Sequence, residues 1–162
     1  MKQLILVRHG KSSWDYKVDD RDRPLTQRGI NDGHLVASAF RAAHITVDAI
    51  YSSPANRALH TCTIFLRTLG FPEDRFRLSE ELYEFSGEGV MAFVRHLHDR
   101  LNTVMIFGHN HAFTNVVNQW GSTYVDNLPT TGLAQLQFNT DSWASLSGGT
   151  TIQTIFPKQL LQ

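Results

Sequence analysis

The segment Gln3–Gly10 constrains the fold of this chain more than any other. Residues 3–7 form a short, mostly apolar run, which predicts a strand buried on both faces. The run stops at Arg8, His9 and a glycine. Such a strand places Arg8 and His9 at the carboxyl edge of a sheet, where open α/β sheets bind their ligands. We therefore expect the rest of the chain to build a pocket around His9.

Two later strands are predicted to end in the same way. Residues 47–52 lead into a Ser-Ser-Pro turn that is followed by Arg57, and residues 103–107 lead into Gly-His-Asn, which contains His109. Because parallel strands end at one edge, these side chains should gather near His9. An arginine fork matches phosphate oxygens, and an imidazole can attack phosphorus. The arginines would supply the charge that Mg²⁺ supplies in kinases, so no metal and no cofactor are predicted.

The remaining pattern predicts the fold class. Apolar residues at three- and four-residue steps indicate helices over 26–43, 55–69, 90–101 and 113–120, the first capped by Thr26. Residues 11–24 are polar and read as a functional loop. The tail alternates over 133–138 and pairs with 150–156 as an antiparallel hairpin. We expect one domain over residues 1–162: a three-layer αβα sandwich with a mostly parallel central sheet, an antiparallel edge and no capping insertions.

Composition excludes several classes of protein. Fifteen basic residues balance fifteen acidic ones, so no global field favours nucleic acid or an anionic membrane. The single cysteine, Cys62, cannot form an internal disulfide. No apolar run approaches the roughly 20 residues that span a bilayer, and the N-terminal run is too short for a secretory signal. We expect a cytoplasmic protein.

Three motifs carry a resemblance to a known family. The chain resembles the histidine phosphatase superfamily, which also contains the cofactor-dependent phosphoglycerate mutases, in three signatures: Leu6–Gly10, Ser52–Ala58 with Thr61 following, and Gly108–Asn110. The chain also resembles the small SixA-type phosphohistidine phosphatases in its short length and in four segments. These are the Lys-Ser-Ser-Trp string after the first signature, Asp22–Gly29, Asn127–Gly132 and the Asp-Ser-Trp at 141–143. The resemblance implies a phosphoglycerate mutase-like fold and a phosphatase activity.

The resemblance also implies roles for individual residues. His9 would attack phosphorus and become phosphohistidine, while Arg8, Arg57 and His109 would bind the phosphoryl oxygens. The family's proton donor is usually an acidic residue in a Leu-x-Glu context, which Glu84 matches. Glu84 could also be only a loop carboxylate or a helix cap. If the leaving group is an imidazole, acid catalysis by Glu84 is dispensable.

Two positions depart from the mutase-like branch. Lys11 replaces the acid that follows the glycine there, and Asp15 stands where that branch has a later asparagine. The departures speak against mutase activity, and Ser12 and His111 receive no assigned role. We expect a phosphatase acting on phosphohistidine in a protein such as a phosphotransfer domain. The alternatives are a phosphatase of small phosphomonoesters and a non-catalytic phosphate-binding module.

Overall fold

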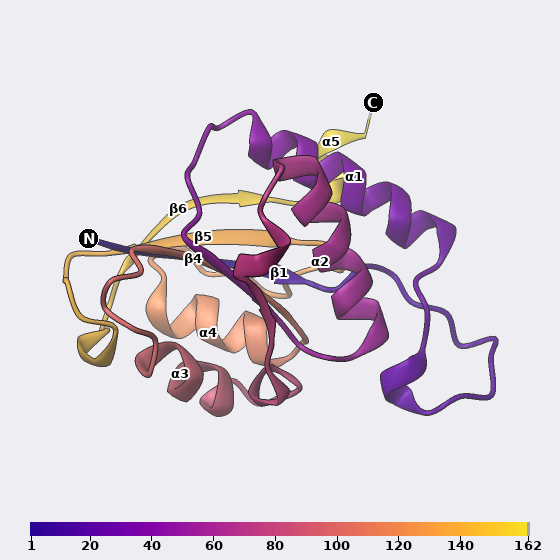
Figure 1. Ribbon diagram of the computed structural model, residues 1–162, viewed down its shortest axis with the longest axis horizontal. Helices are drawn as coiled ribbons and strands as arrows, with labels where there is room; N and C mark the ends of the chain where they lie inside the picture. Colours follow the sequence, from indigo (N-terminus) through magenta and orange to yellow (C-terminus); the bar gives the residue numbers. More distant parts are fainter. Residues whose placement is uncertain (162) are drawn as a thin grey trace.

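A six-stranded mixed sheet forms the centre of the molecule (Figure 1). The computed structural model describes residues 1–161. The strands lie in the order β3-β2-β4-β1-β5-β6. Their bounds are Lys2–Arg8 for β1, Ala49–Ser52 for β2, Phe76–Leu78 for β3, Thr103–Gly108 for β4, Leu133–Phe138 for β5 and Thr150–Ile155 for β6. The first four strands of the sheet are parallel, and β5 and β6 form the antiparallel edge. The predicted fold class is confirmed.

Helices cover both faces of this sheet (Figure 1). They are α1 (Gln27–Arg41), α2 (Asn56–Leu69), α3 (Glu88–Arg95), α4 (Ala112–Trp120) and the short α5 (Pro157–Leu160). α1, α2 and α5 lie on one face and α3 and α4 on the other, each group over its own hydrophobic core. Within residues 1–161, no helix is both long enough and apolar enough to span a membrane.

The structure differs from the sequence-based expectation in three elements: β3, α3 and the short α5, which was not predicted. β3 was not predicted, because it is three residues long, mostly exposed and centred on Arg77, and so lacks an apolar signature. α3, expected to reach residue 101, ends at Arg95. Tighter turns follow it, in which the Leu97 amide donates to the Val94 carbonyl at 3.1 Å. Leu97 and Leu101 still pack against the core from these turns, which explains the misleading helical spacing.

The loop between β1 and α1 is held by specific contacts. The Thr26 side chain accepts a hydrogen bond from the Gly29 amide at 3.1 Å, which confirms the predicted cap. A Cβ at Gly29 would collide with the Lys11 carbonyl, so only glycine lets α1 pack against this loop. The buried Arg23 donates to the Ser12 hydroxyl at 2.6 Å. These contacts hold the 3-10 helix η1 (Asp20–Asp22) beside the carboxyl edge of the sheet.

Candidate active site

The carboxyl edge brings together the four residues expected to bind phosphate. Arg8 ends β1 and His9 follows it, Arg57 is the second residue of α2, and His109 directly follows β4. Arg8, His9 and Arg57 line a cavity of about 280 Å³. The ring centroids of His9 and His109 lie 5.3 Å apart. The predicted gathering of these side chains is therefore present in the fold.

His9 is a buried, neutral imidazole with one nitrogen free. Its Nδ1 lies 2.7 Å from the carbonyl oxygen of Gly10, a hydrogen-bond acceptor, so Nδ1 carries the proton. Burial lowers the pKa of His9 to about 3; the charges of Arg57 and Arg8 add to this effect, and the hydrogen bond to Gly10 opposes it. At neutral pH the lone pair on Nε2 is consequently available. This is the state in which an imidazole acts as a nucleophile.

His109 is held by two neighbours in the opposite tautomer. Its Nδ1 lies 3.5 Å from Nη2 of Arg57, which can only donate, and its Nε2 lies 2.8 Å from the hydroxyl oxygen of Ser53. Nε2 therefore carries the proton and donates to Ser53. Burial, followed by the proximity of His9, lowers the pKa of His109 to about 3. Sequence reasoning did not single out Ser53, although it lies within the second signature.

The two arginines keep part of their donor capacity unused. Arg8 donates from Nη1 to the Leu128 carbonyl at 2.9 Å. Arg57 donates from Nη1 to the main-chain carbonyl of Asp20 at 2.6 Å and from Nη2 to its carboxylate at 2.9 Å. The Nε atoms of both arginines are buried and have no hydrogen-bond partner within residues 1–161. Buried donors of this kind are rare in folded proteins and favour an anion-binding site.

Asp20 is a pocket residue that the sequence did not reveal. Its carboxylate accepts hydrogen bonds from Arg57, from Arg23 at 3.3 Å and from the Tyr83 hydroxyl at 2.6 Å. Burial alone would raise the pKa of Asp20, but the hydrogen bonds from Tyr83 and Arg57 outweigh it and lower the pKa to about 2. Asp20 is thus ionised at neutral pH. Nothing in the local pattern distinguishes it from the other aspartates of this charged loop.

Glu84 does not lie in the cavity. Its carboxylate caps the start of α3, accepting hydrogen bonds from the amides of Gly87 at 2.8 Å, of Val90 at 3.0 Å and of Ser86. Burial acts to raise the pKa of Glu84, but these hydrogen bonds outweigh it and lower the pKa. Glu84 is absent from the cavity lining. The geometry matches the capping interpretation and gives no support to the proton-donor role.

Loops and exposed aromatic rings border the cavity. Trp14, 76% exposed, and Phe85, 47% exposed, line it together with Lys11 and Ser12. The Trp14 ring lies over the Arg23 guanidinium, 3.3 Å from its central carbon. Over the part of the chain that the structure describes, no helical insertion covers the cavity, and η1 is the element that lies beside it.

Two unassigned residues lie outside the cavity lining. His111 is exposed at the start of α4 and makes no capping hydrogen bond, and Asp15 lies in the exposed part of the loop between β1 and α1.

In residues 1–161 there is no group of three His, Cys, Asp or Glu side chains placed to hold a metal ion. The structure therefore assigns no residue to a metal.

Comparison with known proteins identifies the family. The model of the histidine phosphatase superfamily (branch 1) matches residues 4–89, more than half of the chain. This chain belongs to the histidine phosphatase superfamily. The match covers the first two signatures, with Arg8, His9 and Arg57, and so confirms the resemblance drawn from the sequence.

Solved structures match this chain over nearly its whole length. The protein histidine phosphatase SixA complexed with tungstate gives a TM-score of 0.82 at 21% identity, covering 98% of this chain and 99% of that one. The putative phosphohistidine phosphatase SixA from Agrobacterium tumefaciens gives 0.78 at 20% identity, covering 96% and 98%. At these identities the likeness establishes a common fold.

Curated relatives match over shorter segments. A 2,3-bisphosphoglycerate-dependent phosphoglycerate mutase of Beijerinckia indica is 34% identical over 73 residues, which are 43% of this chain and 35% of the mutase. An uncharacterized protein of Mycobacterium tuberculosis is 33% identical over 103 residues, 64% of this chain and 62% of that protein. The chain therefore spans less than two thirds of either relative.

Proposed function

We propose that this protein hydrolyses phosphohistidine on another protein, as a phosphatase of the SixA type. The covalent intermediate is phosphohistidine on His9. The neutral ring of His9, with its proton on Nδ1, supports the role of nucleophile. The buried, unpartnered Nε atoms of Arg8 and Arg57 support phosphoryl binding. His109, whose ring centroid lies 5.3 Å from that of His9, supports a place for this side chain beside the phosphoryl group.

The reaction takes place in two displacement steps. In the first, the Nε2 lone pair of His9 forms a bond to phosphorus, and the bond from phosphorus to the substrate imidazole breaks with its electron pair going to that ring. In the second, water attacks phosphorus, the bond to His9 breaks, and the water proton passes to solvent. Arg8 and Arg57 stabilise the charge on the equatorial oxygens in both steps.

One observation carries the choice of substrate: neither Glu84 nor Asp20 is in a state to deliver a proton to a leaving group in the cavity. Glu84 is bound to the amides that begin α3, and Asp20 is ionised, with a pKa of about 2. An alkoxide needs such a proton in order to leave. A phosphorylated imidazole that is protonated on its other nitrogen leaves as a neutral ring. The site therefore favours a phosphohistidine over an alkyl phosphomonoester.

The surroundings of the cavity favour a protein as the carrier of that phosphohistidine. The cavity is small, at about 280 Å³, and Trp14 and Phe85 present large exposed aromatic surfaces to it. Aromatic residues and arginine are enriched at the centres of protein interfaces. A small metabolite would leave most of this aromatic surface in contact with water.

The deciding experiment compares two substrates side by side in the presence of EDTA. One is a phosphotransfer domain phosphorylated on histidine, the other para-nitrophenyl phosphate, and the His9→Ala variant serves as control. We expect a kcat/KM at least 100-fold higher for the protein, and no turnover of either substrate by the variant. Preference for the ester would favour the small-molecule phosphatase. Hydrolysis of neither substrate would favour the phosphate-binding module, and a metal-reversible loss in EDTA would contradict the metal-free mechanism.

A trapping experiment tests the intermediate independently. Acid-labile, base-stable ³²P should appear on the wild-type protein mixed with the labelled phosphotransfer domain and be absent from His9→Ala. Arg57→Ala should weaken the binding of tungstate as well as lower the rate. Turnover without any labelled enzyme would contradict the covalent mechanism, and unchanged tungstate binding would remove Arg57 from the phosphate site.

A further inference from the structure

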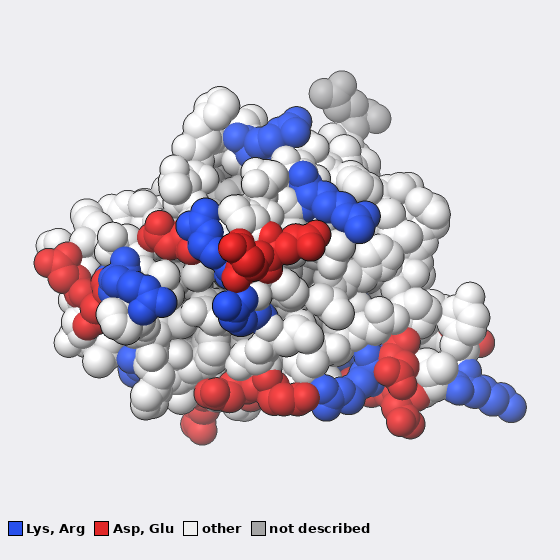
Figure 2. Space-filling model, viewed as in Figure 1, with Lys and Arg blue, Asp and Glu red and all other residues white. Residues whose placement is uncertain are grey.

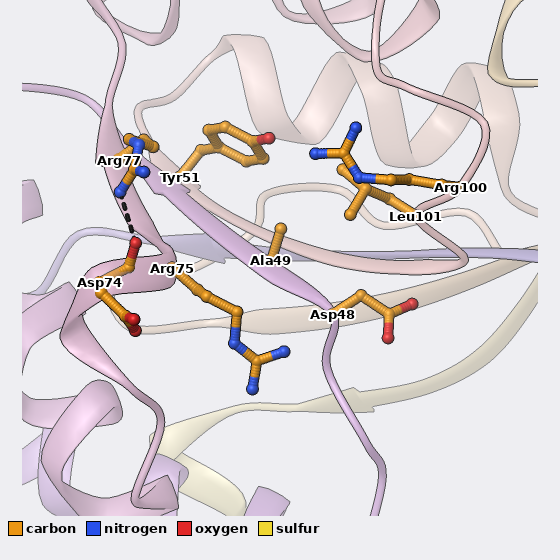
Figure 3. A pocket seen from close by; sticks show the side chains of 8 residues that line it. All are labelled: Asp48, Ala49, Tyr51, Asp74, Arg75, Arg77, Arg100 and Leu101. Atoms are coloured by element: carbon orange, nitrogen blue, oxygen red, sulfur yellow. Dashed lines mark hydrogen bonds between the residues drawn. The ribbon is translucent and has the colours of Figure 1, made fainter.

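A second cavity lies at the edge of the sheet opposite the active site (Figure 3). It has a volume of about 370 Å³ and lies at the amino ends of β2 and β4, whose carboxyl ends lead to Ser53 and His109. Ala49 begins β2, and Leu101 immediately precedes β4. This cavity shares no lining residue with the one that contains His9.

Three arginines from separate segments surround this cavity. Arg75 comes from the 3-10 helix η2 (Glu73–Arg75), Arg77 from β3 and Arg100 from the turns after α3 (Figure 3). On the face shown in Figure 2, cationic and anionic side chains are intermixed. Among residues 1–161, however, none of these three guanidinium groups forms an ion pair within 4.0 Å of a carboxylate. In Figure 3, Arg77 and Arg100 lie on the same side of β2 as Tyr51, whereas the Arg75 guanidinium lies on the other side.

Two aspartates, Asp48 and Asp74, also line the cavity beside the three arginines. The carboxylate of Asp48 accepts hydrogen bonds from the amides of Asn102 at 2.8 Å and Thr103 at 3.0 Å, and so anchors the start of β4. Asp74 contacts Arg77 through its main-chain carbonyl, at 2.7 Å, and its side chain is exposed. The three arginines outnumber the two aspartates, so the cavity lining keeps a net positive charge.

Main-chain carbonyls hold the guanidinium of Arg77 in place. Nη1 of Arg77 donates to the carbonyls of both Asp74, at 2.7 Å, and Phe76, at 2.9 Å. These bonds fix the guanidinium plane and leave its other two nitrogens without a hydrogen-bond partner among residues 1–161. The Arg75 guanidinium lies 5.2 Å from the ring centroid of Phe71. Ordered guanidinium groups lose less conformational entropy when they bind an anion.

Part of the cavity floor is apolar. Ala49 and Leu101 contribute aliphatic surface, and the Tyr51 ring points into the hollow while its centroid lies 5.2 Å from that of Phe93 (Figure 3). Arginine forks recognise phosphate oxygens, and an apolar floor favours an organic group over a bare ion. We propose that this cavity binds the phosphoryl group of a small organic molecule, with the organic part against Tyr51 and Leu101.

The test uses phenylphosphonate, a probe that the active site cannot hydrolyse. Amide resonances of the ¹⁵N-labelled full chain report each cavity separately, so binding at His9 does not obscure the result. We expect saturable shifts at Ala49, Tyr51, Arg77 and Leu101, with inorganic phosphate binding at least fivefold more weakly there. The double variant Arg77→Ala/Arg100→Ala should weaken this binding at least tenfold, whereas the control Arg67→Ala, an exposed arginine of α2, should not.

Each other outcome contradicts the proposal in a defined way. No shift of these amides at 10 mM phenylphosphonate, a concentration about ten times a weak millimolar dissociation constant, would overturn the site altogether. Equal affinity for phosphate and phenylphosphonate would overturn the role of the apolar floor. Shifts that survive the double variant would mean that the arginines do not bind the anion. None of these results depends on whether the protein hydrolyses phosphohistidine.

Discussion

The carboxylate of Asp20 lies 2.9 Å from Nη2 of Arg57, although the two residues are 37 positions apart in the sequence. A loop anion thus contacts the same guanidinium that is proposed to bind the phosphoryl group. The Tyr83 hydroxyl, which donates to the same carboxylate oxygen at 2.6 Å, keeps Asp20 in this position. Phosphate and Asp20 should therefore repel each other across the pocket.

Removing the charge of Asp20 should strengthen oxyanion binding. We expect Asp20→Asn to lower the dissociation constant of tungstate about fivefold, because an unfavourable contact between two charges about 4 Å apart costs about 1 kcal/mol at the dielectric constant of water. Isothermal titration calorimetry measures this change. Asp19→Asn, an exposed neighbour in the same loop, is the matched control and should have no effect. Weaker binding by Asp20→Asn would show that the carboxylate mainly orders Arg57.

Substitution of Glu84 should reduce stability without changing the chemistry. Glu84→Gln places an amide against backbone donors at Ser86, Gly87 and Val90, and we expect a loss of about 1–3 kcal/mol of unfolding free energy. The kcat for the phosphorylated protein should stay within about twofold of wild type. Urea unfolding and steady-state kinetics measure the two effects, with exposed Glu81→Gln as control. A 100-fold fall in kcat with unchanged stability would restore Glu84 as the proton donor.

Thr61 should position the nucleophile through its hydroxyl. The buried Oγ1 accepts a hydrogen bond from the Gly10 amide at 2.9 Å and donates to the Arg57 carbonyl at 2.8 Å, so it joins the turn after His9 to α2. Thr61→Val keeps the volume but removes both bonds, and we expect kcat to fall about tenfold or more. Thr61→Ser keeps the hydroxyl and should restore most of the rate. Equal rates for the two variants would contradict the positioning role.

Acid should destabilise the fold through its two buried histidines. Their pKa values fall from 6.5 to about 3 on folding, so between these values the unfolded chain binds more protons and stability decreases as pH falls. Each histidine should remove about 2 kcal/mol between pH 6 and pH 4. His109→Asn should reduce this slope, measured by urea unfolding at several pH values, whereas exposed His34→Asn should not. A slope unchanged by His109→Asn would contradict its neutral state.

The aromatic border of the pocket should discriminate between the two substrate classes. We expect Trp14→Ala to raise KM for the phosphorylated protein about tenfold, as loss of a central interface aromatic commonly does, and to affect para-nitrophenyl phosphate at least fivefold less. Tyr124→Ala is the control, because Tyr124 is also 76% exposed and does not line the pocket. Equal losses for both substrates would assign Trp14 to phosphoryl binding alone.

Much of the active site could be predicted from the sequence, because local pattern and topology determine it together. Short buried runs that end in Arg8-His9 and before His109 mark the ends of neighbouring parallel strands, which must meet at one edge. Arg57 follows from its place at the start of α2. Thr26, as a cap, follows from the hydrogen-bonding needs of a helix start, and the antiparallel hairpin follows from the alternation of its two strands.

Tertiary structure decided the rest. Glu84 matches a family motif, but the direction of its side chain depends on the amides that begin α3, which compete for the same carboxylate. Asp20 reaches Arg57 only because contacts of Arg23 hold the loop against the sheet. β3 forms because β2 offers an unpaired edge, not because its own residues favour a strand. In each case the outcome depends on hydrogen bonds between distant parts of the chain, which no local pattern encodes.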